Sequence, residues 1–353
     1  MNADNIYRSY KNKVIILTLL FVFIASFLNA GQPDTLFRSD GIIRMELRAD
    51  FSAINKDRDG DPQEHRGMLT YRTPDGETVR LKVKVTTRGN FRLDPSNCSF
   101  PPLLLDFKKD EVENTLFANQ DKLKLVTPCQ TEEDVVNEYL IYKMYNQVTD
   151  LSMKVRLVNI LYFDSGNNKK LFERHSFFIE DRDHTAERNN AIAREMFATP
   201  YDLAEDNIKK LSVFQYLIGN KDWFISSRKN IILMQSKDLS SLFAVPYDFD
   251  MSGFVNADYS KPEGVPDYLL SDKRVYKGVC YSFDELKEVF EFYRELKSQF
   301  ESVINGQELL SKTVKKHILQ YLNDSYKVLE NNELVANKFL NTCETRKDYN
   351  LFE

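Results

Sequence analysis

The order of two hydrophobic patterns along the chain is the feature that most restricts how it can fold. After residue 35, apolar residues alternate with polar ones, most clearly in Arg80-Leu-Lys-Val-Lys-Val85, where one face is charged and the other apolar. Near the end of the chain a capping box, Ser282-Phe-Asp-Glu285, is followed by apolar residues at helical spacing. Strands that come before helices predict an α+β fold built in two parts.

Turn residues and capping residues predict the individual elements. Thr73-Pro-Asp-Gly76 and Asp164-Ser-Gly-Asn167 each separate two alternating runs, which predicts two hairpins. Thr131-Glu-Glu-Asp134 resembles a capping box and predicts a helix over about 132–147, and Gly219 suits the end of a helix over 208–217. The runs predict strands over 42–47, 68–71, 79–85, 100–107, 122–126, 155–163, 176–180, 231–234 and 242–245, a loop over 55–64, and a last helix over 308–329. We expect a strand-rich part over 31–181 and a helical part over 182–353.

The first thirty residues differ from the rest of the chain. Arg8, Lys11 and Lys13 precede an apolar run over 14–28, which predicts a signal peptide over 1–30 and export to the periplasm, the cell surface or the medium. An uncleaved anchor is the alternative, and it is the only case in which we expect membrane contact. Removing these three basic residues together with Asp4 changes the formal charge from −5 to −7. Such an acidic chain is not expected to bind nucleic acid.

Four cysteines become informative if the chain is exported. Cys98, Cys129, Cys280 and Cys343 show no C-x-x-C spacing, which argues against a structural zinc site. We favour a disulfide between Cys98 and Cys129, because they lie within one region of the sequence. Buried free thiols remain the alternative.

Carboxylates and amides concentrate in one segment that carries the chemistry. Asp222 follows a helix end, Asn230 opens a strand, and Asp248 and Asp250 follow the next strand. The two strands form a predicted hairpin that returns the chain to its starting edge, so we expect these side chains to share one cleft. Oxygen ligands suit magnesium, and phosphoryl transfer needs an aspartate for the attacking hydroxyl plus Asn and Asp on the metal. The plain alternative is that these residues cap turns.

Other site types find no support in the sequence. It has neither G-x-G-x-x-G nor G-x-x-x-x-G-K-[ST], and no G-x-S-x-G elbow. The four histidines show no i, i+4 pair. The sequence therefore argues against a Rossmann site, a Walker phosphate loop, a serine hydrolase and a histidine metal site.

The order of the motifs resembles the spore-coat CotH kinase-like family, whose members have an atypical protein-kinase fold. The resemblance covers about residues 80–255 and implies a two-lobed kinase-like fold. The motifs that carry it are Thr87-Arg-Gly-Asn90, Asn137-Glu-Tyr-Leu-Ile-Tyr-Lys143, Val155-Arg-Leu-Val-Asn-Ile-Leu161, Phe177-Phe-Ile-Glu-Asp181, the segment 222–230 and Val245-Pro-Tyr-Asp-Phe-Asp250.

The resemblance implies a role for each acidic residue. Asp222 would be the catalytic base, and Asn230, Asp248 and Asp250 would bind the metal. The implied cofactors are ATP and Mg²⁺, with Mn²⁺ as a substitute, and the implied partner is an unidentified protein substrate or surface partner. Asp248 and Asp250 lie two residues apart, so on an extended backbone both would point to one face.

One departure from the family pattern concerns the residue that holds the nucleotide. Pro101-Pro102 replaces the family's basic pair, so we look for the lysine at Lys122 or Lys124, which share a strand face and could pair with Glu138. The alternative is a solvated strand face. Arg88 contacts phosphate or, alternatively, braces the structure through an ion pair.

The same departure leaves a second function open, namely a catalytically inactive surface or periplasmic interaction protein with a kinase-like shell. The roles of four further residues also stay open. Trp223 stacks on a ligand or packs in the core, and Arg182, Arg188 and Asn189 contact substrate or are merely solvated.

Overall fold

The computed structural model describes residues 35–58, 61–261 and 274–349. The predicted signal peptide over 1–30 lies outside these ranges. Within them, no helix has the length and apolar character that a membrane span requires.

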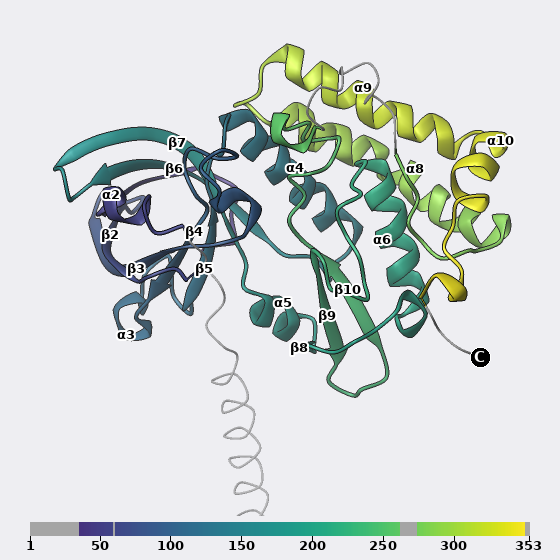
Figure 1. Cartoon of the computed structure of the whole chain (residues 1–353), viewed down its shortest axis with the longest axis horizontal. Coiled ribbons are helices and arrows are strands. Elements are labelled where there is room, and N and C mark those ends of the chain that lie inside the picture. Colours follow the sequence, from purple (N-terminus) through teal and green to yellow (C-terminus); the bar gives the residue numbers. More distant parts are fainter. Residues whose placement is uncertain (1–34, 59–60, 262–273, 350–353) are drawn as a thin grey trace, which may run out of the picture.

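Seven strands of the first part close into a barrel (Figure 1). Consecutive strands pair antiparallel in the order β1-β2-β3-β4-β5-β7-β6, and the ring is closed by parallel pairing of β1 with β6. The interior is apolar: Leu47, Val85, Leu105, Leu123 and Phe178 are all completely buried. The strands are β1 (Ile43–Ala49), β2 (His65–Arg72), β3 (Thr78–Thr87), β4 (Leu103–Phe107), β5 (Lys122–Val126), β6 (Val155–Asp164) and β7 (Lys169–Ile179).

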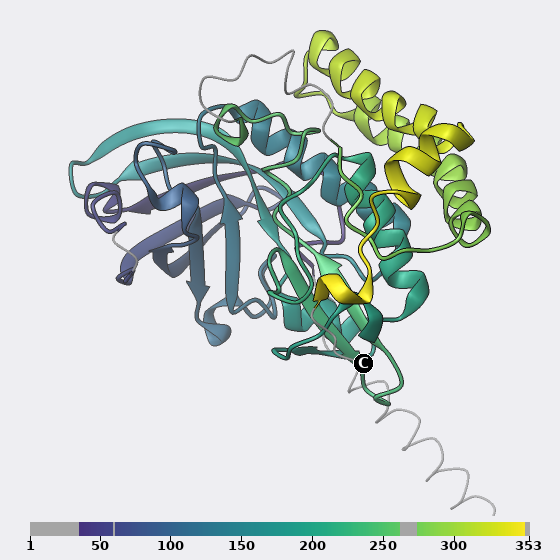
Figure 2. The ribbon, with the colours of Figure 1, turned by 45° about the vertical axis from the view of Figure 1, so that its right-hand side comes forward.

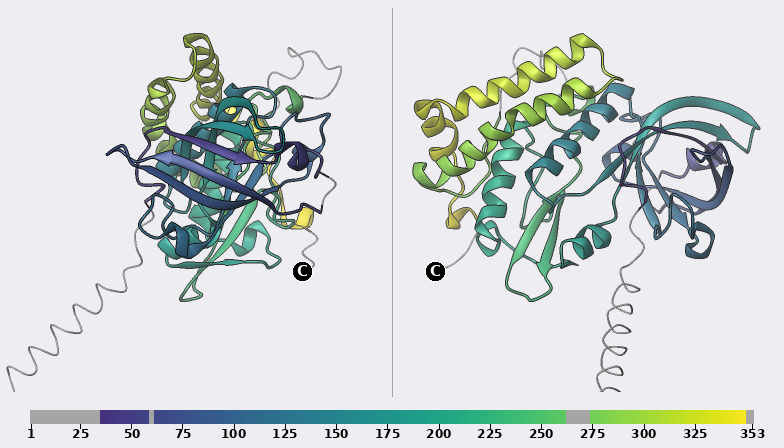
Figure 3. Two further views of the ribbon diagram at one scale, coloured as in Figure 1. Left: turned by 90° about the vertical axis from the view of Figure 1, so that its left-hand side faces the viewer. Right: turned by 180° about the vertical axis from the view of Figure 1, so that it is seen from behind.

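The structure confirms the predicted strands. Their closure into a barrel was not predicted from the sequence. Both predicted hairpins form, since β2 pairs with β3 and β6 pairs with β7. β7 begins at Lys169, earlier than its predicted start at 176, because its first half is a solvent-facing strand without apolar alternation. Closure depends on β1 meeting β6, whose sequences lie more than a hundred residues apart (Figure 3). No local pattern predicts such a pairing.

Four long helices pack around a second apolar core beside the barrel (Figures 1 and 2). Tyr145, Phe214 and Phe300 meet there, with ring centroids 4.7 Å and 6.2 Å apart for the pairs that share Phe214. The helices are α4 (Glu132–Val148), α6 (Glu205–Leu217), α8 (Phe283–Gly306) and α9 (Lys312–Leu329). The short elements are α2 (Phe51–Ile54), α3 (Lys109–Val112) and α10 (Asn332–Val335), with 3₁₀ and π turns at 91–93, 200–202, 258–260, 336–340 and 346–349.

The predicted helices are confirmed with shifted starts, since α6 begins at Glu205 and not at 208, and the start of the last long helix also moves. The side chain of Thr131 accepts the N–H of Asp134 at 3.2 Å, and Ser282 and Glu285 cap each other reciprocally. Gly219 ends α6 with a φ of +64°, the left-handed conformation that glycine adopts without strain. The last long helix begins after Ser311, not at 308, because the Ser311 hydroxyl accepts the N–H of Val314 and fixes the start there.

A small three-stranded sheet lies below the helices in the order β10-β9-β8 (Figure 1). β9 (Ile231–Ser236) and β10 (Leu242–Pro246) form the predicted hairpin. β8 (Ala191–Arg194) pairs with β9 and follows α5 (Arg182–Arg188). Neither β8 nor α5 is marked by a hydrophobic period in the sequence.

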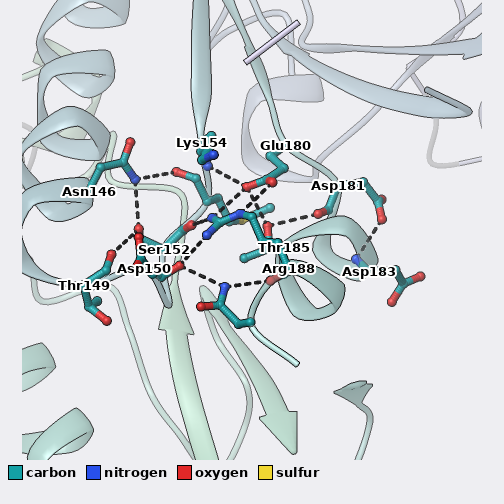
Figure 4. A network of polar contacts seen from close by, with 12 residues as sticks. Asn146, Thr149, Asp150, Ser152, Lys154, Glu180, Asp181, Asp183, Thr185 and Arg188 are labelled. Carbon is teal, nitrogen blue, oxygen red and sulfur yellow. Dashed lines mark hydrogen bonds and ion pairs between the residues drawn. The ribbon is translucent and has the colours of Figure 1, made fainter. Parts of the chain in front are cut away.

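The connection from the barrel to the helical part is held by a buried ion pair (Figure 4). Glu180, only 2% exposed, accepts hydrogen bonds from Arg188 at 2.9 Å and 3.0 Å, from Thr185 at 3.0 Å and from the backbone N–H of Lys154 at 2.9 Å. Arg188 also donates to the carbonyls of Asp150 and Ser152. Arg188 is therefore a structural residue, which corrects its interpretation as a substrate contact.

Both pairs of cysteines form disulfides. Cys98–Cys129 confirms the favoured pairing, and Cys280–Cys343 joins two segments 63 residues apart in sequence. The first attaches the loop between β3 and β4 to the segment before α4. The second attaches the end of the chain to the segment before α8.

Candidate functional site

Asp222 and Asn230 lie in direct contact. The Asn230 side chain donates from Nδ2 to the Asp222 carbonyl at 2.7 Å and to Asp222 Oδ2 at 3.0 Å, while Lys229 forms an ion pair with Asp222 Oδ1. Asn230 has a φ of +54°, a left-handed conformation that asparagine tolerates better than most residues. The loop therefore bends back so that Asn230 supports Asp222.

The β9–β10 hairpin brings Asp248 to the same place. Tyr247 N–H donates to the Asn230 carbonyl at 3.0 Å, so the residues just before β9 and just after β10 are adjacent. Asp248 N–H donates to the Tyr142 hydroxyl oxygen of α4 at 2.9 Å, and Phe249 is completely buried against Tyr142. This buried ring fixes the two aspartates on either side of it.

The backbone at Asp248 differs from the extended form expected. Its φ is +60°, so the argument that an extended chain directs Asp248 and Asp250 to one face is wrong. Asp248 is half-buried, whereas Asp250 is 7% exposed and accepts a hydrogen bond from the Tyr259 hydroxyl at 3.1 Å. The two carboxylates still lie close enough to act on each other, as the pKa of Asp250 shows.

Buried acids gather around Asp250. Burial, followed by the charge of Asp248, raises the pKa of Asp250 to about 7. Burial, followed by the charges of Asp250 and Asp248, raises the pKa of Glu138 in α4 well above its usual value. Buried carboxylates that lie near one another repel unless positive charge lies between them. The negative charge of this site therefore requires neighbouring cations.

Two arginines from the loop after β3 supply positive charge. Arg92 and Arg88 both oppose the rise in the pKa of Glu138. Burial lowers the pKa of Arg92, but Tyr259, Asp250, Glu138 and Asp248 together raise it above its usual value. Arg92 also donates to the Thr127 carbonyl, next to the Cys98–Cys129 bridge. Arg92 and Arg88 are therefore further candidate partners of Glu138, beside the predicted Lys122 and Lys124.

The two candidate lysines differ in position. Lys122 is exposed and lies opposite Asp106 of β4. Lys124 is half-buried, and its Nζ lies 4.9 Å from the centre of the Tyr247 ring. Tyr247 directly precedes Asp248 in the sequence. Burial, then the charge of Arg88, lowers the pKa of Lys124 to about 8, while Asp248 and Asp181 oppose the shift. Of the two, Lys124 faces the acidic site.

A pocket of about 250 Å³ includes Lys124 together with Ile231 and Tyr247, the sequence neighbours of Asn230 and Asp248. It is lined by Lys124, Arg182, Arg194, Glu195, Ser227, Arg228, Ile231, Ile232, Leu233 and Tyr247. A larger hollow of about 1250 Å³ lies on the barrel against β1, β2 and β3, and none of the acidic residues above lines it. None of these acidic residues lines the smaller pocket either, but Lys124, Ile231 and Tyr247 connect that pocket to the segments that carry Asn230 and Asp248.

Lys277 braces the loop that carries Asp222. Its Nζ donates to the carbonyls of Trp223 at 2.8 Å and Lys221 at 3.1 Å, on either side of Asp222. Trp223 is 3% exposed within an apolar cluster, which confirms packing in place of ligand stacking. Lys277 lies three residues before Cys280, so the second disulfide holds this brace in place.

Three residues of the site carry the ligand type that magnesium prefers in proteins. Asn230, Asp248 and Asp250 offer only oxygen ligands, and the Nδ2 bonds of Asn230 leave its Oδ1 as an acceptor. Within the described ranges, no three or more histidine, cysteine, aspartate or glutamate side chains form a metal-binding group. Two carboxylates and one amide would therefore need waters or substrate phosphates to complete a coordination shell.

Several residues of the site were not predicted from the sequence. Arg92, Tyr142, Tyr259 and Lys277 reach the site only through tertiary contacts. One usable signal was present: Arg92 lies four residues after Arg88 in a loop that ends at a cysteine.

Comparison with known proteins gives distant structural similarity alone. No family model matches the sequence, and no curated protein matches it. Among solved structures, a Helicobacter pylori proinflammatory kinase, CtkA, is similar with a TM-score of 0.37 and 11% sequence identity. The similarity covers 67% of this chain and 91% of that chain.

Proposed function

We propose that this protein is a magnesium-dependent phosphotransferase with a two-lobed kinase-like fold, acting on an exported or surface protein. The observation that carries the proposal is the contact of Asp222 with Asn230 beside Asp248, all next to a pocket that holds Lys124. One carboxylate near an amide and a second carboxylate is the arrangement that phosphoryl transfer requires.

Each residue has a distinct part in this proposal. Asp222 would accept the proton of the acceptor hydroxyl, and Asn230, Asp248 and Asp250 would hold magnesium. Magnesium would neutralise phosphate charge. Lys124 would pair with the phosphates of ATP, while Arg88 and Arg92 balance the buried acids.

The proposal is tested by transfer of labelled phosphate from ATP, with magnesium or manganese, to the protein itself and to a generic acidic protein. We expect incorporation that requires the divalent metal. A wild-type protein whose melting temperature does not respond to nucleotide plus metal would contradict the proposal.

The lowered pKa of Lys124 predicts that ATP binding weakens in alkaline solution. Lys124 is charged below a pKa of about 8 and neutral above it, so its attraction to phosphate disappears as the pH rises through 8. Asp248, Asp181, Arg88, Arg182 and Tyr247 face the same ammonium, and the two arginines keep their charge over this pH range, so the change in charge comes from Lys124. We expect ATP affinity, measured by calorimetry, to fall about tenfold between about pH 7 and about pH 9.

The matched control is Lys124→Arg, which keeps its charge over this range. Its ATP affinity should stay nearly constant with pH. An equally steep fall in the variant would assign the pH dependence to another group.

Lys277 is predicted to be a positioning residue. Lys277→Met removes both hydrogen bonds that bracket Asp222, so the loop carrying Asp222 becomes less ordered. We expect kcat to fall about tenfold with little change in KM for ATP, because misplacement affects the reacting group more than nucleotide binding. Lys316→Met, on the exposed face of α9, is the control and should behave as wild type. A rise in KM alone would contradict the positioning role.

A specific observation also favours the second candidate, an inactive interaction protein. Both carboxylate oxygens of Asp222 are engaged, one by Lys229 and one by Asn230. If that engagement persists with ligand bound, the protein would bind nucleotide or a partner without transfer. Nucleotide binding combined with no labelled product under any metal condition would select this alternative.

A further inference from the structure

The pocket beside the acidic site is strongly basic although the whole chain is acidic. Four of its lining residues are cationic and one, Glu195, is anionic. Glu195 pairs with both Arg182 at 2.7 Å and Arg228 at 3.4 Å. Lys124 and Arg194 have no carboxylate within ion-pair distance among the described residues. The pocket therefore keeps a surplus of positive charge.

These cations come from four separate parts of the fold. Lys124 lies on β5 of the barrel, Arg182 begins α5, Arg194 ends β8, and Arg228 lies in the loop before β9. Arg228 holds a left-handed backbone, with φ at +53°. Cations that converge from distant elements into one 250 Å³ pocket are suited to a compact anion.

Two backbone groups directly before Arg182 are not free to bind a nucleobase. Recognition of a purine edge uses free backbone donors and acceptors. The Glu180 N–H already donates to the Lys154 carbonyl at 2.8 Å. The Asp181 carbonyl already accepts from Thr185 twice, at 2.9 Å from its N–H and 3.0 Å from its hydroxyl. These two groups of the connecting segment are therefore occupied within the protein (Figure 4).

We propose that this pocket recognises the polyphosphate chain of the phosphate donor and does not select the base. The donor class is any phosphate-rich ligand of this size, either a nucleoside triphosphate with any base or an inorganic polyphosphate. This inference rests on the proposed phosphotransferase function. It adds that Arg182, Arg194 and Arg228 determine the choice of donor.

The test measures binding by calorimetry to the purified protein with magnesium present, using ATP, GTP, inorganic tripolyphosphate and adenosine as probes. We expect ATP, GTP and tripolyphosphate to bind within about threefold of each other, and adenosine at least about thirtyfold more weakly. Affinity for tripolyphosphate should fall steeply as NaCl rises from about 0.05 M to about 0.5 M, since charge carries the binding.

Arg194→Glu is the informative variant, because Arg194 is exposed and takes no part in the ion pairs around Glu195. Its tripolyphosphate affinity should fall about tenfold or more, with an unchanged melting temperature. Arg80→Glu on the exposed face of β3 makes the same change in net charge outside the pocket and should bind as wild type. An equal loss in both variants would overturn the inference, because it would mean that only the overall charge matters.

Two failures are distinguishable. If adenosine binds as tightly as ATP, or if tripolyphosphate does not bind, the inference is wrong and the phosphotransferase proposal survives. If tripolyphosphate binds as expected but no donor yields labelled product, the phosphotransferase proposal is wrong and the anion site stands.

Discussion

Replacing Asp222 by asparagine is expected to reduce phosphate transfer about 10²–10⁴-fold, the usual contribution of a general base. Asparagine has the same shape and retains an oxygen for the contact with Asn230 at 3.0 Å, but it cannot accept the hydroxyl proton. Binding of ATP should stay near the wild-type value because Lys124 and the pocket are unchanged. The measurement is a steady-state transfer rate with saturating ATP and magnesium.

Asp238→Asn provides the matched control. Asp238 is exposed in the turn between β9 and β10 and accepts hydrogen bonds from Ser240, away from Asp222. This variant should transfer phosphate at the wild-type rate. If Asp222→Asn retains full activity while the control is also active, Asp222 is not the base.

Removing one partner of the Glu180–Arg188 pair should give the largest loss of stability. Glu180 is 2% exposed and the Arg188 side chain is 23% exposed, so Glu180→Ala leaves a largely buried guanidinium without its carboxylate. We expect the free energy of unfolding to fall by about 3–5 kcal/mol, as for other broken buried pairs. Denaturant unfolding followed by circular dichroism measures this change.

The nearby exposed pair shows what burial contributes. Arg182→Ala removes the contact with Glu195 at 2.7 Å, where both side chains are about half exposed. Surface pairs of this kind contribute about 0–1 kcal/mol, so this variant should unfold close to wild type. Equal effects of Glu180→Ala and Arg182→Ala would refute the assignment of Glu180 as a buried structural residue.

The central part of the site was predictable because it depends on local structure. Asn230 and Asp248 flank a hairpin whose strands are visible as apolar runs, so their approach follows from antiparallel pairing alone. Lys124 was found in the same way, since alternation in β5 sets the side on which it points. The hairpin and the strand β5 can each be predicted from a few consecutive residues, and so can the positions of these side chains.

Residues that depend on distant contacts were not predictable. Arg92 reaches Glu138 only because the β3–β4 loop folds toward α4, and Lys277 reaches Asp222 from 55 positions further along the sequence. Closure of the barrel between β1 and β6 is another such pairing. No hydrophobic period marks these encounters, because tertiary packing decides them.

The first disulfide sets a condition on when the site can be complete. Cys98 and Cys129 fasten the loop that carries Arg88 and Arg92, the two cations that oppose the charge of Glu138. Thiols stay reduced in the cytosol and oxidise after export. If the chain is exported as we propose, the covalent link that fastens Arg88 and Arg92 beside Glu138 forms only after the chain has left the cytosol.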